Sequence, residues 1–548
     1  MWRHARGVVD EHPAMSRHCR RSRGPPMRRS ARRGMRPSRS SPGTNIEPRP
    51  APGVSFAAPP LRPLSLGTPM FFRVQNLGPL RDAEIDLSKD LIVLTGPNNS
   101  GKTYLAWSVY GLHRMRFGLQ AIPVVESWAK ALLEAPDHSV DFNELFARDG
   151  QEMLATIASD CRSKLHLCFA AGNEQFAGAT VSVRSESHGL NSVDPRSAGI
   201  VGLNGETYLK LFLASADTTT RFFFALFNQF GSRSKVVDLL QLGQGLEAAW
   251  GPTTVLLSQG LSAAERAMMP QRVALLLRME LARVLFPNSI IFPAERIALN
   301  LFAKELALKR NALVDEMVDA DLDEQPEKPL ELIRRKAGRY PWPIRDGLTV
   351  ASDLASLSRE RTTFADLADD LERAILGGTV SISEEGEFLY SPGAATESRF
   401  AIHLTASVVK SLTSLVFYFR HLAKKGDFLI IDEPELNLHP ENQRKIARIL
   451  AKAVRRGFKV MISTHSDYVL RELNHLVMLN KLPAEEATKL GYDPEFALDP
   501  TRVGVYLVDE HRAESIPIAE TGFSIKTIDA IVNQLDIDEQ RLYARLAD

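Results

Sequence analysis

A ten-residue stretch, Leu94 to Thr103, constrains the fold of this chain more than any other feature. It reads Leu-Thr-Gly-Pro-Asn-Asn-Ser-Gly-Lys-Thr, so that four residues separate Gly96 from the triplet Gly101-Lys102-Thr103. This is the spacing of a phosphate-binding loop. An apolar run precedes the loop and a helix-like stretch, 104–112, follows it, which is the strand-loop-helix setting that the motif requires. The stretch therefore predicts an α/β protein with a phosphate site at the end of a strand.

Each part of this loop has a predicted role in holding the phosphates of a nucleotide. Glycines let backbone N–H groups turn inward, and the helix N-terminus adds a partial positive charge. Lys102 is predicted to reach the β- and γ-phosphates, and the Thr103 hydroxyl to ligate Mg²⁺. We therefore expect a nucleotide and Mg²⁺ as cofactors, with the nucleotide held by Gly96, Pro97, Asn98, Asn99, Ser100, Gly101, Lys102 and Thr103.

A second polar segment lies about 330 residues further on, where the apolar run 428–431 ends in Asp432 and Glu433. A buried parallel strand explains the apolar run, and open α/β sheets bind ligands at the carboxyl ends of their strands. Asp432 is predicted to belong to the Mg²⁺ shell, and Glu433 to polarise the attacking water as a general base. The next apolar run ends at His465, which is placed to contact a γ-phosphate. The predicted catalytic residues are Glu433, His465 and Lys102, and the predicted metal ligands are Thr103 and Asp432.

Three motifs occur in the order GPNNSGKT, FLIIDEPELNLHP and ISTHSDYVL. In these motifs the chain resembles the ABC-type ATPase superfamily, on the branch shared by RecF, SMC-like heads and the overcoming-lysogenization-defect nucleases. Within that branch it is most similar to the standalone bacterial AAA-family ATP-binding proteins. The resemblance covers roughly residues 70–115, 289–297 and 400–510. It implies an α/β P-loop NTPase head with a mixed, partly parallel central sheet and inserted, mainly helical lobes.

The resemblance also implies a homodimer that holds ATP between the phosphate loop of one copy and a signature helix of the other. The signature position corresponds to 405–412, where Ser407 matches the serine that meets the γ-phosphate across the dimer. Val408 stands where the family usually has glycine, which predicts slow turnover. Asn437 and Leu438 match the loop that crosses the dimer.

Composition and periodicity predict how the chain is divided. Residues 1–69 contain fourteen arginines, twelve prolines and three acids, so they cannot bury enough apolar surface to fold. Folded-looking sequence begins at Met70, which we expect to be the natural translation start. The expected parts are a disordered tail (1–69), an ATPase N-lobe with the phosphate loop (70–115), an inserted α+β lobe (116–288), a core strand (289–300), a helical insertion (301–377), an ATPase C-lobe with signature helix, paired acids and histidine (378–512), and a helical C-terminal tail (513–548).

Local patterns predict further elements. In the inserted lobe they indicate helices over 125–133, 151–158 and 263–285, and strands over 165–170 and 180–183. In the C-lobe they predict a hairpin over 379–382 and 387–390, and a helix whose apolar face runs from Leu404 to Leu422.

Charge and composition bear on partners and location. The net charge of +1 combines +11 in the first 69 residues with −10 in the remainder, so DNA is a partner suggested by analogy and not by net charge. No apolar run reaches the length of a membrane span. The three cysteines lack the spacing of a metal site. We therefore expect a cytoplasmic protein that does not enter a membrane.

The expected function is that of an ATP hydrolase whose ATP-dependent head dimerisation acts on a partner effector protein or DNA, in DNA repair or phage defence by analogy. One alternative is a nucleotide sensor or regulatory subunit with little hydrolysis, which Val408 favours. Another is the ATPase subunit of a nuclease complex. Intrinsic nuclease activity is disfavoured because only 69 residues follow Leu479, and a transporter subunit because of the altered signature and the two insertions.

Overall fold

The computed structural model describes residues 69–115, 123–135, 139–186, 196–202, 207–216, 219–228, 263–303, 340–393, 398–519, 521–524 and 526–547. The prediction of a disordered tail therefore falls outside the described residues, as does 304–339 within the predicted helical insertion.

The described residues form a nine-stranded mixed sheet with the order β5-β1-β2-β16-β15-β3-β14-β13-β9. Strands β15, β3, β14, β13 and β9 run parallel, whereas β1 pairs antiparallel with both β5 and β2. Strand β16 joins the two halves, antiparallel to β15 and parallel to β2. The bounds are β1 Met70–Leu77, β2 Leu80–Asp86, β3 Leu91–Thr95, β5 Thr180–Ser185, β9 Ser289–Phe292, β13 Phe428–Asp432, β14 Lys459–Thr464, β15 Val503–Asp509 and β16 Arg512–Ile516.

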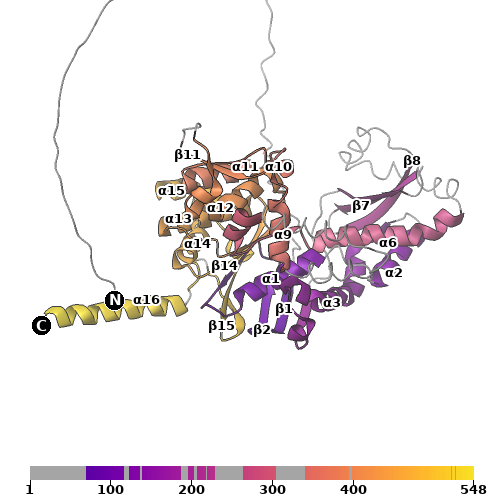
Figure 1. The fold of residues 1–548 in the computed structure, drawn as a ribbon. Coiled ribbons are helices and arrows are strands. Elements are labelled where there is room, and N and C mark those ends of the chain that lie inside the picture. The colour runs from indigo at the N-terminus through magenta and orange to yellow at the C-terminus, as the bar shows by residue number, and fades with distance from the viewer. Residues whose placement is uncertain are drawn as a thin grey trace, which may run out of the picture. The chain divides into compact units, whose positions relative to one another are not determined.

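Helices cover both faces of this sheet (Figure 1). Along β3, Ile92 and Leu94 belong to one hydrophobic core, and Leu91 and Val93 belong to the other, because successive side chains of a strand point to opposite faces. Burial on both faces explains why the central strands are apolar throughout. The first core contains residues of α1 Lys102–Arg114, α2 Pro123–Glu134, α3 Phe142–Phe169 and α6 Ala263–Leu285. The second contains residues of α11 Ala365–Leu371, α12 Ser407–Phe417, α13 Pro440–Arg455 and α14 Asp467–Leu479.

The described residues also form two smaller sheets, the long helix α16 and several short helices. One sheet has the order β4-β8-β7-β6, and the other has the order β10-β11-β12. No helix within the described ranges combines the length and the hydropathy needed to cross a bilayer. The remaining bounds are β4 Ser139–Asp141, β6 Arg196–Gly202, β7 Thr207–Ala216, β8 Thr219–Asn228, β10 Gly378–Ile382, β11 Phe388–Pro392, β12 Phe400–Ala401, α9 Trp342–Ala351, α10 Leu354–Leu357, α15 Ala484–Lys489, α16 Lys526–Ala547, the 3₁₀ turns η2 Asn173–Phe176, η5 Ile402–Leu404, η7 Pro494–Phe496 and η8 Pro500–Arg502, and the π-helical turns η4 Glu372–Leu376 and η6 Tyr418–Leu422.

Two local predictions are wrong. Residues 165–170 were expected to form a strand, but 165–169 are the end of α3. Cys161, Leu165 and Cys168 are all buried and lie at helical spacing. Because this face packs on α1, the apolar run at 165–169 continues the helix instead of forming a strand. Leu404 was expected on the buried face of a long helix, but it is 68% exposed in η5, and α12 begins only at Ser407.

The predicted domain boundaries remain predictions, although two strands bear on them. Strand β5 comes from the stretch expected to be an inserted lobe, yet it pairs with β1 at the edge of the large sheet. Most of strand β16 comes from the expected helical tail, yet it pairs with β15. Both segments therefore contribute to the sheet that carries the phosphate loop.

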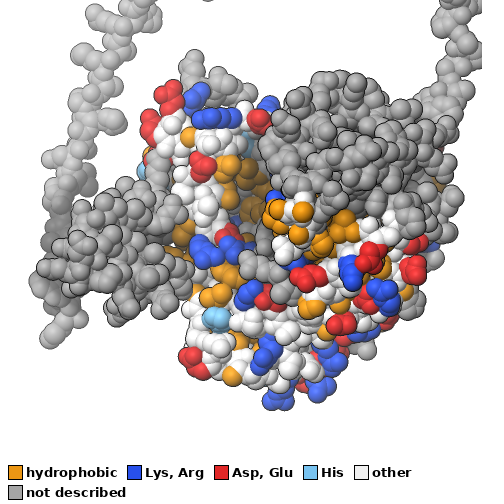
Figure 2. Space-filling model, turned by 90° about the vertical axis from the view of Figure 1, so that its right-hand side faces the viewer, with side chains coloured by type: hydrophobic (Ala, Val, Ile, Leu, Met, Phe, Trp, Pro, Cys, Tyr) orange, Lys and Arg blue, Asp and Glu red, His pale blue; other side chains and the backbone are white. Residues whose placement is uncertain are grey.

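Figure 2 shows Lys and Arg side chains interspersed with Asp and Glu over the described part of one face, with hydrophobic side chains gathered between them. On that face the described side chains form no extended area of one charge sign.

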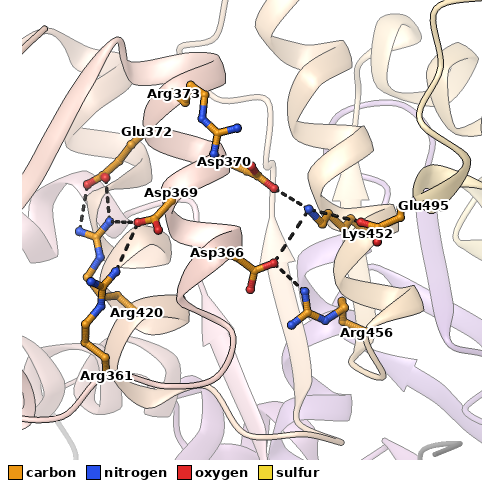
Figure 3. A network of polar contacts seen from close by, with 10 residues as sticks. All are labelled: Arg361, Asp366, Asp369, Asp370, Glu372, Arg373, Arg420, Lys452, Arg456 and Glu495. Carbon is orange, nitrogen blue, oxygen red and sulfur yellow. Dashed lines mark hydrogen bonds and ion pairs between the residues drawn. The ribbon is translucent and has the colours of Figure 1, made fainter. Parts of the chain in front are cut away.

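A network of ion pairs joins α11 and the turn η4 that follows it to η6, which continues α12, and to α13 (Figure 3). Arg420, in η6, donates to Glu372 Oε2 at 2.7 Å and to Asp369 Oδ1 at 2.9 Å. On α13, Lys452 donates to Asp370 Oδ2 at 2.8 Å. Arg456 follows α13 and donates to Asp366 Oδ2 at 2.6 Å. Single exposed ion pairs stabilise little, but a connected set fixes orientation. The network therefore holds α12, which carries Ser407, and α13, which follows the paired acids, in a fixed relation to α11.

Candidate nucleotide-binding site

The phosphate loop connects β3 to α1 and takes backbone conformations that require glycine. Gly96 has φ 140° and Gly101 has φ 105°, in the region that side chains disfavour. A Cβ atom on Gly96 would lie 2.1 Å from the carbonyl oxygen of Val508, and one on Gly101 would lie 2.7 Å from the Leu80 side chain. The loop therefore passes too close to β15 and to the start of β2 for other residues at these positions.

Lys102 lies beneath this loop with its ammonium group enclosed by loop oxygens. Its Nζ donates to Gly96 O at 3.0 Å, to Pro97 O at 2.7 Å and to Ser100 Oγ at 3.3 Å. Burial lowers the pKa of Lys102 to about 8, against the opposing effect of the nearby carboxylates. The buried cation is thus placed directly under the loop that would surround an anionic phosphate.

Parallel pairing brings the second polar segment to the same edge of the sheet. Strand β14 lies between β3 and β13, with Thr464 opposite Thr95 and Ser463 opposite Asp432. Thr103 Oγ1 donates to Asp432 Oδ2 at 3.1 Å, although 329 residues separate the two in sequence. Ser463 Oγ hydrogen-bonds to the other carboxylate oxygen, Oδ1. The two predicted metal ligands therefore adjoin each other.

Glu433 follows Asp432 and has an unusual backbone. Its φ is 49°, a left-handed conformation that costs a non-glycine residue about 1–2 kcal/mol. Its N–H donates to Ser463 O at 3.0 Å, and its Oε1 lies 3.8 Å from His465 Nε2. Burial, and after it the nearby Lys102 charge, lower the pKa of His465, which favours the neutral ring.

These side chains line one open cavity of about 620 Å³. The lining residues are Pro79, Asn98, Asn99, Ser100, Gly101, Lys102, Thr103, Tyr104, Asp432, Glu433, Ser463 and His465. Gly96 and Pro97 are not among them, but their carbonyl groups hold Lys102. Ser407 does not line the cavity either, and it is exposed at the first residue of α12. The structure therefore brings together most of the predicted site residues and leaves Ser407 apart on the surface.

The residues present fit a magnesium nucleotide. Thr103 and Asp432 offer adjacent oxygen atoms of the hard type that Mg²⁺ prefers, and Mg²⁺ usually takes one or two protein ligands together with phosphate oxygens and water. In the described ranges, no group of three or more His, Cys, Asp or Glu side chains could hold a metal ion. A metal ion at this site would therefore depend on nucleotide oxygens for the rest of its ligands.

Three residues around the site were not predicted from the sequence to belong to it. Ser463 is the polar last-but-one residue of a buried strand, and that position was a usable signal. Glu435 accepts hydrogen bonds from Thr464 Oγ1 at 2.7 Å and from His465 N at 2.8 Å, and burial raises its pKa. Arg296 is buried behind the paired acids, and burial lowers its pKa to about 10.

Comparison with protein-family models gives independent support. Residues 349–470 match the model described as AAA ATPase domain. This range contains α12, the paired acids of β13 and His465, so it matches the half of the site that lies far from the phosphate loop in sequence. The described sheet, with the phosphate loop between β3 and α1, has the strand-loop-helix arrangement of a P-loop nucleotide-binding fold.

Solved structures similar to the described fold include three heads of SMC proteins, each at 12% identity. One is an SMC head bound to the C-winged helix domain of ScpA, with a TM-score of 0.29 over 82% of this chain and 97% of that chain. The second is an SMC head with an extended coiled coil bound to the C-terminal domain of ScpA from Pyrococcus furiosus, with a TM-score of 0.27 over 86% and 99%. The third is the SMC head domain from Thermotoga maritima, with a TM-score of 0.26 over 82% and 99%. No curated protein matches the sequence.

Proposed function

We propose that this chain binds ATP with Mg²⁺ in the cavity at the ends of β3, β13 and β14, and that it hydrolyses the nucleotide there. The observation that carries the proposal is the 3.1 Å hydrogen bond from Thr103 Oγ1 to Asp432 Oδ2, with Lys102 and Glu433 lining the same cavity. A phosphate loop alone would support binding, whereas the paired acids beside it supply the groups that hydrolysis needs.

Each side chain has a defined part in the proposed reaction. A bound Mg²⁺ would neutralise phosphate charge and polarise the phosphoryl oxygens. Lys102 would exchange its loop carbonyls for phosphate oxygens, and Ser463 would keep the Asp432 carboxylate turned toward Thr103. Glu433 would accept the proton of the attacking water, and the neutral His465 beside it would donate one hydrogen bond to the γ-phosphate.

We further propose that two copies of the chain dimerise head to tail with ATP between them. This part of the proposal is supported by the exposure of Ser407 at the N-terminus of α12, where a helix can meet an anion of another molecule. Val408 is partly buried and packs against the second core, so only part of its side chain would face the second copy in the proposed dimer.

The dimer would act on a partner protein or on DNA. The mixed charges on the face in Figure 2 and the net −10 of residues 70–548 give DNA no electrostatic support. A partner protein is therefore the first candidate to test, and DNA-stimulated turnover with a steep salt dependence would establish the alternative.

Phosphate release by the purified chain tests the proposal. The expected result is Mg²⁺-dependent release with saturation in ATP. If the chain binds ATP and dimerises but releases no phosphate, hydrolysis is refuted and the chain is a nucleotide sensor, as the valine at position 408 would favour.

Replacing Ser407 by Arg is expected to abolish the ATP-dependent dimer while the monomer still binds ATP within about threefold of its original affinity, because the bulk of the long side chain would fill the space through which the N-terminus of α12 approaches the partner's nucleotide. The molar mass of the chain with and without Mg·ATP would be measured by light scattering, in a Glu433→Gln background that slows turnover. Thr488→Arg, at an exposed position on α15, is the control. A dimer that survives Ser407→Arg would contradict the assigned interface.

A further inference from the structure

Arg296 is the first helical residue after β9, in a helix described over 296–303, and its guanidinium group is buried among backbone carbonyls. It donates from Nη1 to Asp432 O at 2.7 Å and from Nη2 to Glu433 O at 2.7 Å. It also donates from Nη1 to Pro293 O at 3.2 Å and from Nε to Ser411 O at 3.0 Å. One side chain thus joins the end of β9, the backbone of both acids and the middle of α12.

The contact with Glu433 bears on the strained part of the site. The left-handed backbone of Glu433 is fixed at its N–H by Ser463 O, at 3.0 Å, and at its carbonyl by Arg296. Strained conformations persist only where the surroundings determine them fully. Without the guanidinium group, the peptide that follows Glu433 could rotate, and the carboxylate would move relative to the cavity.

A second side chain near Arg296 also binds the backbone of α12. Asn300, one turn further along the same helix, donates from Nδ2 to Lys410 O at 2.8 Å. Arg296 and Asn300 therefore hold consecutive carbonyls of α12, at Ser411 and Lys410, four and three residues after Ser407. A shift of α12 would pull on the same side chain that fixes the backbone of Glu433.

We propose that Arg296 is a positioning residue for hydrolysis. It holds Glu433 in its active backbone conformation and couples that conformation to the position of α12. This inference rests on the proposed function and deepens it, because it makes hydrolysis depend on the position of α12. In a copy whose Ser407 does not contact the nucleotide of a second copy, Glu433 would be less well placed to act as the base. Asn300 strengthens the tie to α12 without touching the acids.

The test compares kcat, ATP affinity and thermal stability of Arg296→Met, Arg296→Lys and Asn300→Ala. For Arg296→Met, kcat is expected to fall roughly 100-fold, the effect of misplacing a catalytic group by about 1 Å, while the dissociation constant for ATP stays within about threefold. Arg296→Lys should recover part of kcat, because an ammonium group can reach some of the four carbonyls. Asn300→Ala should lower kcat by a smaller factor with binding unchanged. Arg162→Met, which removes an arginine that also donates to two backbone carbonyls, is the matched control and should leave kcat unaltered.

A double variant separates positioning from a general structural effect. In a Glu433→Gln background, Arg296→Met should cause little further loss in single-turnover hydrolysis, because its effect is exerted through Glu433. Additive losses, or wild-type kcat in both Arg296 variants, would overturn the inference. If Arg296→Met does not fold, Arg296→Lys and Asn300→Ala decide the question. Failure of the wild-type chain to hydrolyse ATP would instead refute the proposed function itself.

Discussion

Replacing Glu433 by Gln is expected to lower the rate of ATP hydrolysis by at least about 100-fold, because a positioned general base contributes roughly 10² to 10⁴ to a rate. The amide cannot accept the proton of the attacking water, but it has the shape of the carboxylate, and the backbone contacts with Ser463 and Arg296 remain available. ATP affinity should therefore stay within about threefold. The proposed dimer should accumulate, because the nucleotide that holds it together is no longer consumed.

The measurement is steady-state phosphate release at saturating Mg·ATP, with affinity determined separately from a fluorescent nucleotide. Glu441→Gln is the matched control: Glu441 is an exposed glutamate on α13 that pairs with Lys445, and its replacement should not change the rate. Retention of a third or more of the wild-type rate by Glu433→Gln would remove this residue from the mechanism.

Replacing Lys102 by Ala is expected to weaken ATP binding itself, by roughly 100-fold. A hydrogen bond to a charged group is worth about 1.5–3 kcal/mol, and each 1.4 kcal/mol is a factor of ten in affinity. The loss has a second cause in the loop, since Lys102 also fixes the carbonyls of Gly96 and Pro97. Titration calorimetry with a non-hydrolysable analogue measures the effect directly.

Lys89→Ala is the control for removing a lysine near the same sheet, because Lys89 donates to Thr501 O and does not line the cavity. Its affinity for ATP should equal that of the wild type. Unchanged affinity in Lys102→Ala would mean that the nucleotide does not occupy this loop.

The parts of the fold that have local sequence patterns could be predicted from the sequence alone. The phosphate loop, the apolar strands around it and the acids at the end of β13 were predicted because glycine spacing and uninterrupted apolar runs report backbone geometry and burial on both faces. The closeness of Thr103 and Asp432 could be inferred only in outline, since it depends on β14 pairing between β3 and β13.

Other features depend on long-range pairing that no local pattern reveals. Arg296 reaches the acids because β9 pairs with β13 in a register that sets Phe292 opposite Ile431. The end of α3 was mistaken for a strand because its apolar residues form a run, and only its packing against α1 shows the helix. Strand β16 was missed because it is short, mostly exposed and charged.

The central claim is that two distant segments act on one nucleotide. It is tested most directly by measuring ATP affinity with and without Mg²⁺, in the wild type, in Thr103→Val, in Asp432→Asn and in the double variant, and comparing the gain in affinity that Mg²⁺ confers. If both side chains hold the same metal ion, each single replacement should remove most of that gain and the double replacement should remove little more, since residues that share one partner are not additive. Independent, additive losses, or a full Mg²⁺-dependent gain in Asp432→Asn, would show that the two segments do not share a magnesium nucleotide.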